Sequence, residues 1–465
     1  MRLVALSSAA ATGLVVWAGL AGESSNGNLA AAFAHRQSLL ASAAATHAPA
    51  QQPPASDGGG TSEAGGGGES SSEARNSGEA QSSPSSSAAA SSTAGAETSP
   101  AGPAAPAATA SPGASAPTRG VSGTRRGPRS KIKHVFIITL QSPGYAATWG
   151  AGSAARYLNT QLRPRGELLS NYYAVAHPDL PNYIAMTSGQ PPNADTAGNC
   201  PTFAQFPAGI KPDAAGRLEA PGCVYPLNVL TVADQLTSSG RQWRAYVEDL
   251  ANGPKPVQSC RHPNSGQPDE TQRERPGDGY ATRHNPFVYF DSLLDLGDCT
   301  SDDLPLTSLP AALASTASTP NYAFIAPNLC HDGSEVVCAD GAPGGLAAAD
   351  GFLAEWVPKI LASPAYRRDG LLVITFGDGP PSDTTGCCES PAHAAAPTAG
   401  GGRVGALLLS PFATAGAESA RPYNHYSLLR TVEDIFALAH LANAGQAGVS
   451  SFATDALSKA LPAHR

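Results

Sequence analysis

Polar side chains follow three predicted strands of this 465-residue chain, at the points where the strands end. Gln141 and Ser142 follow the first of these strands. Asp332 follows a middle strand, and Gly377 and Asp378 follow a late one. In sheets of parallel strands, ligands bind beyond the carboxyl ends of the strands. We therefore expect the chemistry of the protein to lie in these loops, which carry amide, hydroxyl and carboxylate groups.

Short apolar runs alternate with helical patterns after residue 130, and this alternation predicts the fold class. It favours an α/β fold with a mainly parallel central sheet flanked by helices and interrupted by long Cys-, Gly- and Pro-rich insertions. Buried parallel strands are predicted at 134–140, 370–376 and 404–412, and two further strands at 243–249 and 320–328. Helices are predicted at 227–240, 347–363 and 426–441.

The eight cysteines all lie in this second part of the chain. An even number of cysteines in an exported protein suggests four disulfides, whereas a zinc ribbon is disfavoured because no CxxC pair is present. Eight cysteines allow about 105 pairings, so the pattern alone leaves the connectivity open. Proximity in the sequence favours Cys200–Cys223, Cys260–Cys299, Cys330–Cys338 and the vicinal pair Cys387–Cys388.

The first part of the chain predicts export and a long spacer. Residues 1–22 carry one early positive charge and an apolar run, which is typical of a signal peptide, with an uncleaved N-terminal anchor as the alternative. Residues 23–130 are dominated by Ala, Ser, Gly and Pro, a composition that predicts a disordered spacer. A folded domain is predicted at 131–455 and a tail at 456–465. We expect the protein to be secreted or associated with the cell envelope.

The charge balance argues against nucleic acid as a partner. The formal net charge is −8, whereas proteins that bind nucleic acid normally carry a basic excess. A basic patch at 119–133 can be a solvated approach to the domain or a contact with acidic polymers of the envelope. The oligomeric state is left open by the sequence.

Seven stretches occur in the order found in one known family, and together they cover roughly residues 131–440. The chain resembles the bacterial and fungal phosphoesterase family, which groups acid phosphatases with phospholipases C. The resemblance rests on HVFIITLQSPGY (134–145), LLSNYYAVAHPDLPNYIAMTSGQ (168–190), TVADQL (231–236), RHNPFVYF (283–290), NLCHDG (328–333), LLVITF (371–376) and YNHYSLLRTVEDIF (423–436).

This resemblance implies a fold of the alkaline-phosphatase type and the hydrolysis of phosphate esters. It also implies a serine or threonine nucleophile and a divalent metal that neutralises the phosphoryl oxygens. A small phosphorylated molecule or a lipid headgroup is the implied partner. Asp179 stands at the family's nucleophile position, and the family's own residues are kept at His177, Asn182, Asn328, Asp332 and His425. Family metal-ligand positions are occupied by Gln141, Ser142, Asp332 and Asp378.

The sequence departs from the family where the chemistry would occur. Glu-Asn is replaced by Gln141-Ser142, the serine by Asp179, a histidine by Ser334, and Asp-Glu by Gly377-Asp378. The loss of carboxylates should weaken a divalent site, because hard cations require oxygen ligands. An aspartate can form an acyl phosphate elsewhere, but that route needs a cation to bring two anions together.

Two functions remain open at this stage. The first is an exported phosphoesterase whose activity is reduced or lost, and the second is a non-catalytic binding protein of the same fold at the cell envelope. Ordinary structural roles also exist for three residues. Gln141 can bond a loop backbone, Asp179 can cap a turn or helix, and His425 can support the helix that follows it.

Overall fold

The computed structural model describes Ser38 and residues 130–461, apart from 142, 215, 256, 336 and 389–399. The predicted leader, nearly all of the spacer, Ser142, the end of the tail and the basic patch before Ser130 lie outside the described residues. Within the described part of the chain, no helix combines the length and the apolar character that a membrane span would require.

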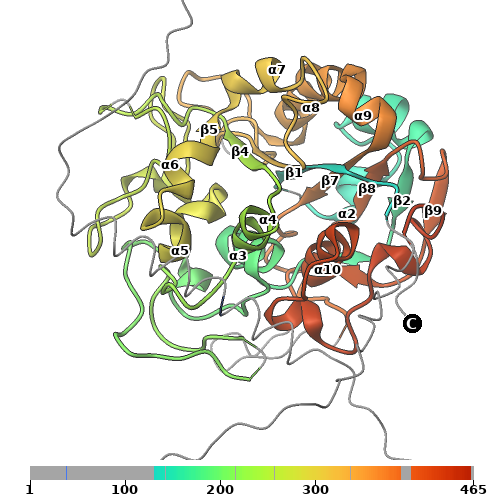
Figure 1. Ribbon diagram of the computed structural model, residues 1–465. Helices are drawn as coiled ribbons and strands as arrows, with labels where there is room; N and C mark the ends of the chain where they lie inside the picture. The colour runs from blue at the N-terminus through green and yellow to red at the C-terminus, as the bar shows by residue number, and fades with distance from the viewer. Residues whose placement is uncertain are drawn as a thin grey trace, which may run out of the picture. The chain divides into compact units, whose positions relative to one another are not determined.

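A central eight-stranded sheet organises the domain (Figure 1). The strand order is β5-β4-β6-β1-β7-β8-β2-β9, and the five strands from β5 to β7 run parallel. β1 lies in the interior of the sheet with all seven residues buried, as expected for a strand covered on both faces. The eight strands are β1 (His134–Leu140), β2 (Glu167–Leu169), β4 (Trp243–Val247), β5 (Asp303–Pro305), β6 (Tyr322–Ala326), β7 (Gly370–Phe376), β8 (Ala406–Leu409) and β9 (Ala417–Ser419).

This mainly parallel sheet confirms the predicted α/β class and all five predicted strands, with one correction. The strand predicted as parallel at 404–412 is β8, which runs antiparallel to both β7 and β2. A continuous apolar run shows that a strand is buried on both faces, but it does not show the direction of the strand. A separate short ladder joins β3 (Tyr172–Tyr173) to β10 (Tyr423–Asn424).

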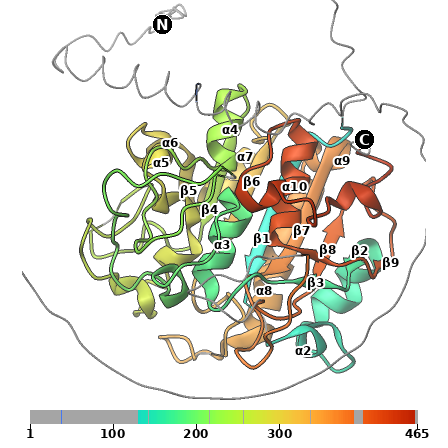
Figure 2. The same ribbon diagram turned by 90° about the horizontal axis from the view of Figure 1, so that it is seen from below.

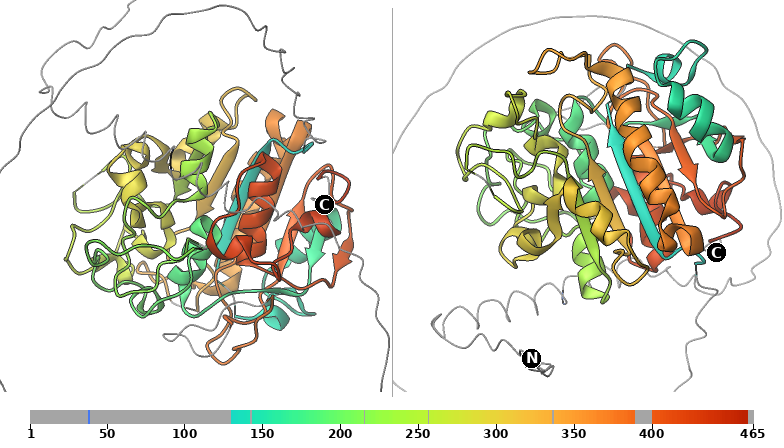
Figure 3. Two further views of the ribbon diagram at one scale, coloured as in Figure 1. Left: turned by 60° about the horizontal axis from the view of Figure 1, so that its bottom comes forward. Right: turned by 90° about the horizontal axis from the view of Figure 1, so that it is seen from above.

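Helices cover both faces of the sheet. Figures 1 and 2 show α3, α4 and α10 side by side on one face, whereas α7, α8 and α9 lie on the other. Figure 3 shows α8 (orange) running alongside β1 (cyan) on that second face. The helices are α3 (Asp179–Ser188), α4 (Val232–Ser238), α7 (Leu309–Ala312), α8 (Gly345–Ala362), α9 (Pro364–Asp369) and α10 (His425–Phe436). Shorter helices are α2 (Tyr145–Trp149), α5 (Asp291–Leu294) and α6 (Asp298–Asp302).

Local sequence signals fix the ends of several helices. Thr231 and Asp234 form a reciprocal capping box at the start of α4, and Asn424 and Ser427 do the same at α10. α3 ends at Gly189, which adopts the left-handed conformation that glycine tolerates. The predicted helices at 227–240, 347–363 and 426–441 are therefore α4, α8 and α10, whereas α3 was not predicted as a helix.

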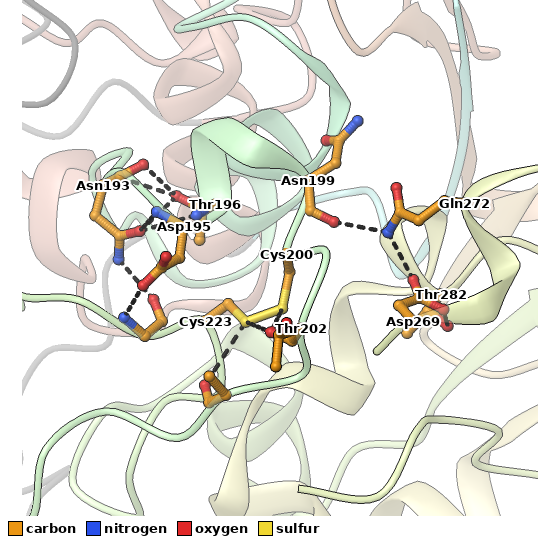
Figure 4. Close-up of a disulfide and its surroundings, with 12 residues drawn as sticks. Asn193, Asp195, Thr196, Asn199, Cys200, Thr202, Cys223, Asp269, Gln272 and Thr282 are labelled. Atoms are coloured by element: carbon orange, nitrogen blue, oxygen red, sulfur yellow. Dashed lines mark hydrogen bonds between the residues drawn. A yellow bond between two sulfur atoms is a disulfide. The ribbon is translucent and has the colours of Figure 1, made fainter. Parts of the chain in front are cut away.

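The four disulfides of the structure are the pairs that proximity in the sequence favoured. Cys200–Cys223 closes a loop that follows α3, and Figure 4 shows its surroundings. Directly before this disulfide, the carbonyl of Asn199 accepts a hydrogen bond from Nε2 of Gln272. The amide oxygen of Asn199 accepts another from the backbone N–H of Leu180 in the first turn of α3. Asn199, the neighbour of the disulfide-bonded Cys200, therefore supports the start of α3.

Two fully buried carboxyl groups lie away from the sheet edge that carries the candidate residues. Burial raises the pKa of Asp303 to about 7, although Asn285 donates a hydrogen bond to it. Burial also holds the pKa of Glu433 well above its usual range, and Oε2 of Glu433 has no hydrogen-bond partner. Both groups are therefore stabilised in their neutral, protonated form.

We predict that these carboxyl groups make the folded domain more stable at pH 5 than at pH 8. A raised pKa means that the folded state binds protons that the unfolded state releases, so stability falls as pH rises from about 4 through the folded pKa. Buried His425, whose pKa falls to about 4, opposes this trend only between its folded and unfolded pKa values. Urea unfolding should show a difference of roughly 2–4 kcal/mol, because one pKa unit corresponds to about 1.4 kcal/mol.

The double variant Asp303→Asn, Glu433→Gln isolates these two groups. It should flatten the dependence of the unfolding free energy on pH, since the amides mimic the protonated acids but do not titrate. An unchanged pH dependence in this variant would show that other groups cause it.

Candidate active site

The loops that follow β1, β6 and β7 meet at one edge of the sheet, as the sequence led us to expect. The backbone N–H of Gln141 donates to the carbonyl of Asp332 at 2.5 Å. The backbone N–H of Gly377 donates to the carbonyl of Leu140 at 2.6 Å. These bonds continue the pairing of three neighbouring strands, so Gln141, Asp332 and Gly377 share the carboxyl edge of the sheet.

Asp179 is the first residue of α3 and forms an ion pair with Arg283. Nε of Arg283 donates to Oδ2 of Asp179 at 2.6 Å, and the two side chains are only 12% and 15% exposed. Nε2 of His284 lies 3.5 Å from the same oxygen. Burial alone would raise the pKa of the Asp179 carboxyl, but His284 and Arg283 outweigh it and hold that pKa well below its usual range. Asp179 is therefore a stable carboxylate.

The carboxylate of Asp179 does not cap α3. The N-cap residue is Pro178, and no side chain forms a capping hydrogen bond there. A negative charge in the first turn still interacts favourably with the helix dipole. The first turn of α3 thus holds an anion that is stabilised by a cation and by the helix end.

His177 and Asp378 form a second pair beside the first. Nδ1 of His177 lies 2.8 Å from Oδ2 of Asp378, and its Nε2 lies 2.9 Å from the carbonyl oxygen of Asp383. Both partners are oxygen acceptors, so the arrangement favours an imidazole protonated on both nitrogens. Burial lowers the pKa of His177, but these contacts outweigh it and leave the pKa raised. Burial also raises the pKa of Asp378, to about 6.

Asn182 and His425 form hydrogen bonds with the backbone around the site. The amide of Asn182 accepts from the N–H groups of Val175 and Ala176 and donates to the carbonyls of Ala176 and Pro178. Asn182 thereby holds the loop that carries His177. Nε2 of His425 contacts the carbonyl of Gly377 at 2.7 Å, and its Nδ1 contacts the hydroxyl of Tyr172. Burial lowers the pKa of His425 to about 4, so this imidazole is neutral at neutral pH.

Gln141 fills the space left by the missing side chain at position 377. A Cβ on Gly377 would lie 3.1 Å from Nε2 and 3.2 Å from Oε1 of Gln141, and 3.3 Å from the ring of Tyr183. Nε2 of Gln141 is buried and has no hydrogen-bond partner. Gln141 and Gly377 are therefore physically linked, because the amide lies against the position that a side chain at 377 would take.

The remaining residues do not fit the divalent ion that the family resemblance implies. Oδ1 of Asp332 accepts from the backbone N–H and the hydroxyl of Ser334, Asp378 is bonded to His177, and Asp179 is bonded to Arg283. Over residues 130–461, as far as the structure describes them, no group of three or more His, Cys, Asp or Glu side chains could hold a metal ion. Each carboxylate at this edge instead has a partner from the chain itself.

Arg283 and His284 were missed as site residues by the sequence reasoning. Their signal was present, because both begin RHNPFVYF, one of the stretches that carry the family resemblance. Both ring nitrogens of His284 are buried and form no hydrogen bond, and the ring stacks on Tyr183 at a centroid distance of 5.3 Å. Nη1 of Arg283 donates a hydrogen bond to the carbonyl of Gln272. The side chain of Gln272 in turn donates to the carbonyl of Asn199, as Figure 4 shows.

The chain matches the model of a known protein family. A model described as the Phosphoesterase family matches residues 154–439, which is more than half of the chain. The chain belongs to the phosphoesterase family. The matched range includes Asp179, Arg283, His284, Asp332 and Asp378, so the ion pairs described above lie within the family's domain.

Curated relatives of this phosphoesterase-family chain include fungal acid phosphatases. An acid phosphatase of Aspergillus fumigatus is 28% identical over 218 residues, covering 47% of this chain and 39% of the relative. A probable acid phosphatase of Kluyveromyces lactis is 24% identical, covering 70% of this chain and 63% of the relative. An acid phosphatase of Aspergillus niger is 27% identical over 63% of this chain and 56% of the relative. The chain thus spans less than two thirds of these relatives.

Solved structures show only a distant likeness. A protein in the alkaline phosphatase superfamily from Vibrio parahaemolyticus has a TM-score of 0.36 at 13% identity, with 71% of each chain covered. The phosphonate monoester hydrolase of Agrobacterium radiobacter has a TM-score of 0.37 at 11% identity, covering 72% of this chain and 79% of that one. The fold assignment therefore rests on the sheet and helices of the chain itself.

We predict that Asp378→Asn lowers the pKa of His177 by about one pH unit or more, because the carboxylate is lost while burial remains. An NMR titration of the histidine ring signals measures this pKa. Asp434→Asn is the matched control, since Asp434 makes a comparable 2.8 Å contact with His440. The control should leave the pKa of His177 unchanged. Equal pKa values in the wild type and in Asp378→Asn would contradict the assigned pair.

Proposed function

We propose that this chain is an exported phosphoesterase-family protein that binds phosphate esters and hydrolyses them slowly or not at all. The ligands expected are small phosphorylated molecules or lipid headgroups. One observation carries the proposal: the residue at the nucleophile position, Asp179, is a carboxylate bound to Arg283 at 2.6 Å.

The chemistry of this position opposes turnover. A serine hydroxyl can attack phosphorus once a base or a metal activates it, whereas a carboxylate and a phosphoryl group repel each other. Arg283 offsets this repulsion in part, but its Nε hydrogen bond is already used by Asp179. Gly377 contributes no side chain, and Gln141 contributes a neutral amide where a carboxylate would bind a cation. The site therefore keeps positive groups for phosphate but lacks an activated nucleophile.

A fully non-catalytic binding protein is the second candidate. It is favoured by the internal bonding of every carboxylate at the site, since Asp332, Asp378 and Asp179 each have a partner within the chain. Family membership favours retained recognition of phosphate esters in both cases. The two candidates differ only in whether residual hydrolysis can be measured.

Export is part of the proposal. It is supported by the leader-like residues 1–22 and by four disulfides, which persist in oxidising compartments. The basic patch at 119–133 is proposed as a contact with acidic envelope polymers, and nucleic acid is not among the proposed partners.

We predict that the purified full chain shows little or no turnover of 4-nitrophenyl phosphate, bis(4-nitrophenyl) phosphate or phosphatidylcholine from acidic to mildly alkaline pH. Addition of Mg²⁺, Ca²⁺, Mn²⁺ or Zn²⁺ should not change this. Turnover should appear when the family residues are restored together, by Gln141→Glu, Ser142→Asn, Asp179→Ser, Ser334→His, Gly377→Asp and Asp378→Glu.

The matched control carries the same set of substitutions without Asp179→Ser. It separates restoration of the nucleophile from restoration of the metal ligands, and it should remain inactive. Efficient metal-dependent turnover by the wild type that is abolished by Asp179→Ala would overturn the proposal.

A further inference from the structure

Two basic side chains, Arg283 and His284, flank the carboxylate of Asp179, and His284 forms no hydrogen bond. Arg283 lies 2.6 Å from the carboxylate, and Nε2 of His284 lies 3.5 Å from Oδ2 of Asp179 and 3.9 Å from Oδ2 of Asp332. His284 is fully buried, yet neither ring nitrogen forms a hydrogen bond. Buried polar groups are normally hydrogen-bonded, so an imidazole that lies 3.5 and 3.9 Å from two carboxylates without a hydrogen bond to either indicates a position prepared for a ligand.

The carboxylate of Asp179 resembles an anionic ligand in this setting. It projects from the first turn of the ten-residue helix α3, where the helix dipole favours negative charge. Its Oδ2 is the acceptor for Arg283 and the nearest acidic oxygen to His284. Helix ends, guanidinium groups and imidazoles are the groups with which proteins bind phosphate oxygens.

We propose that the Asp179 side chain is an internal anion that occupies the place of a ligand's phosphoryl group, so that Arg283 and His284 bind an oxyanion well only after Asp179 is neutralised or displaced. The proposal rests on the proposed function for the class of ligand. It adds that the chain's own carboxylate competes with the ligand and thereby sets the affinity of the site for an oxyanion. The ligand class is a tetrahedral oxyanion, either inorganic phosphate or the phosphoryl group of an ester.

A second ion pair of the same chain provides a matched control. Arg261 and Asp278 are joined by two hydrogen bonds of 2.7 Å, and their side chains are 13% and 10% exposed. Arg283 and Asp179 are 12% and 15% exposed. Breaking either pair therefore releases an arginine of similar burial, but only Arg283 lies beside the unbonded imidazole of His284.

The test is calorimetric titration of the full chain with inorganic phosphate. Asp179→Asn should bind phosphate at least about ten-fold more tightly than the wild type, which corresponds to about 1.4 kcal/mol. Asp179→Ser provides a second variant in case the amide disturbs folding, which near-ultraviolet circular dichroism detects. Adding Arg283→Gln to Asp179→Asn should abolish the gain, and Asp278→Asn alone should produce none.

Several outcomes would overturn the proposal that Asp179 acts as an internal anion. These are equal phosphate affinity in the wild type and both Asp179 variants, an equal gain in Asp278→Asn, or no phosphate binding by any variant. Binding of 4-nitrophenyl phosphate to the wild type is measured in parallel. If the wild type binds the ester but the Asp179 variants gain no phosphate affinity, the proposal of an internal anion is wrong, whereas the proposed function stands. If the Asp179 variants gain phosphate affinity while the wild type hydrolyses the ester efficiently, the proposed function fails alone.

Discussion

The ion pair between Asp179 and Arg283 is the interaction on which the chemistry of this site depends. It joins the first residue of α3 to a segment 104 residues further along the chain, and it stabilises a negative charge at the start of that helix. An ionised group that is mostly buried must be compensated, because its loss of hydration is costly. Arg283 supplies that compensation, and the surrounding backbone holds Arg283 in place through Gln272.

The same principle extends across the whole edge of the sheet. Asp378 is compensated by His177, Asp332 by the N–H and hydroxyl of Ser334, and the space at Gly377 is filled by Gln141. A divalent ion needs several carboxylate oxygens directed at one point. Here each carboxylate is directed at its own partner. These contacts are therefore mutually consistent features of one site.

The sequence predicts the scaffold well because burial leaves a strong local pattern. The runs at 134–140 and 370–376 are β1 and β7 with the predicted bounds, and the helical pattern at 426–441 covers all of α10 except its first residue, His425. The direction of β8 could not be predicted, because a strand buried on both faces has the same composition in either direction. The pairing of Asp179 with Arg283 depends on tertiary contact across 104 residues, which local spacing does not encode. Likewise, the contact between Gln141 and the space beside Gly377 could not be predicted, because it depends on both loops lying at the same edge of the sheet.

A double-mutant cycle on the ion pair tests this account most directly. The free energy of unfolding would be measured in urea for the wild type, Asp179→Asn, Arg283→Gln and the double variant, and the coupling energy obtained by difference. The account predicts a favourable coupling of about 2 kcal/mol or more, as expected for a mostly buried and hydrogen-bonded pair of charges. A coupling below about 0.5 kcal/mol, which is the range of exposed pairs, would contradict the claim that this ion pair organises the site.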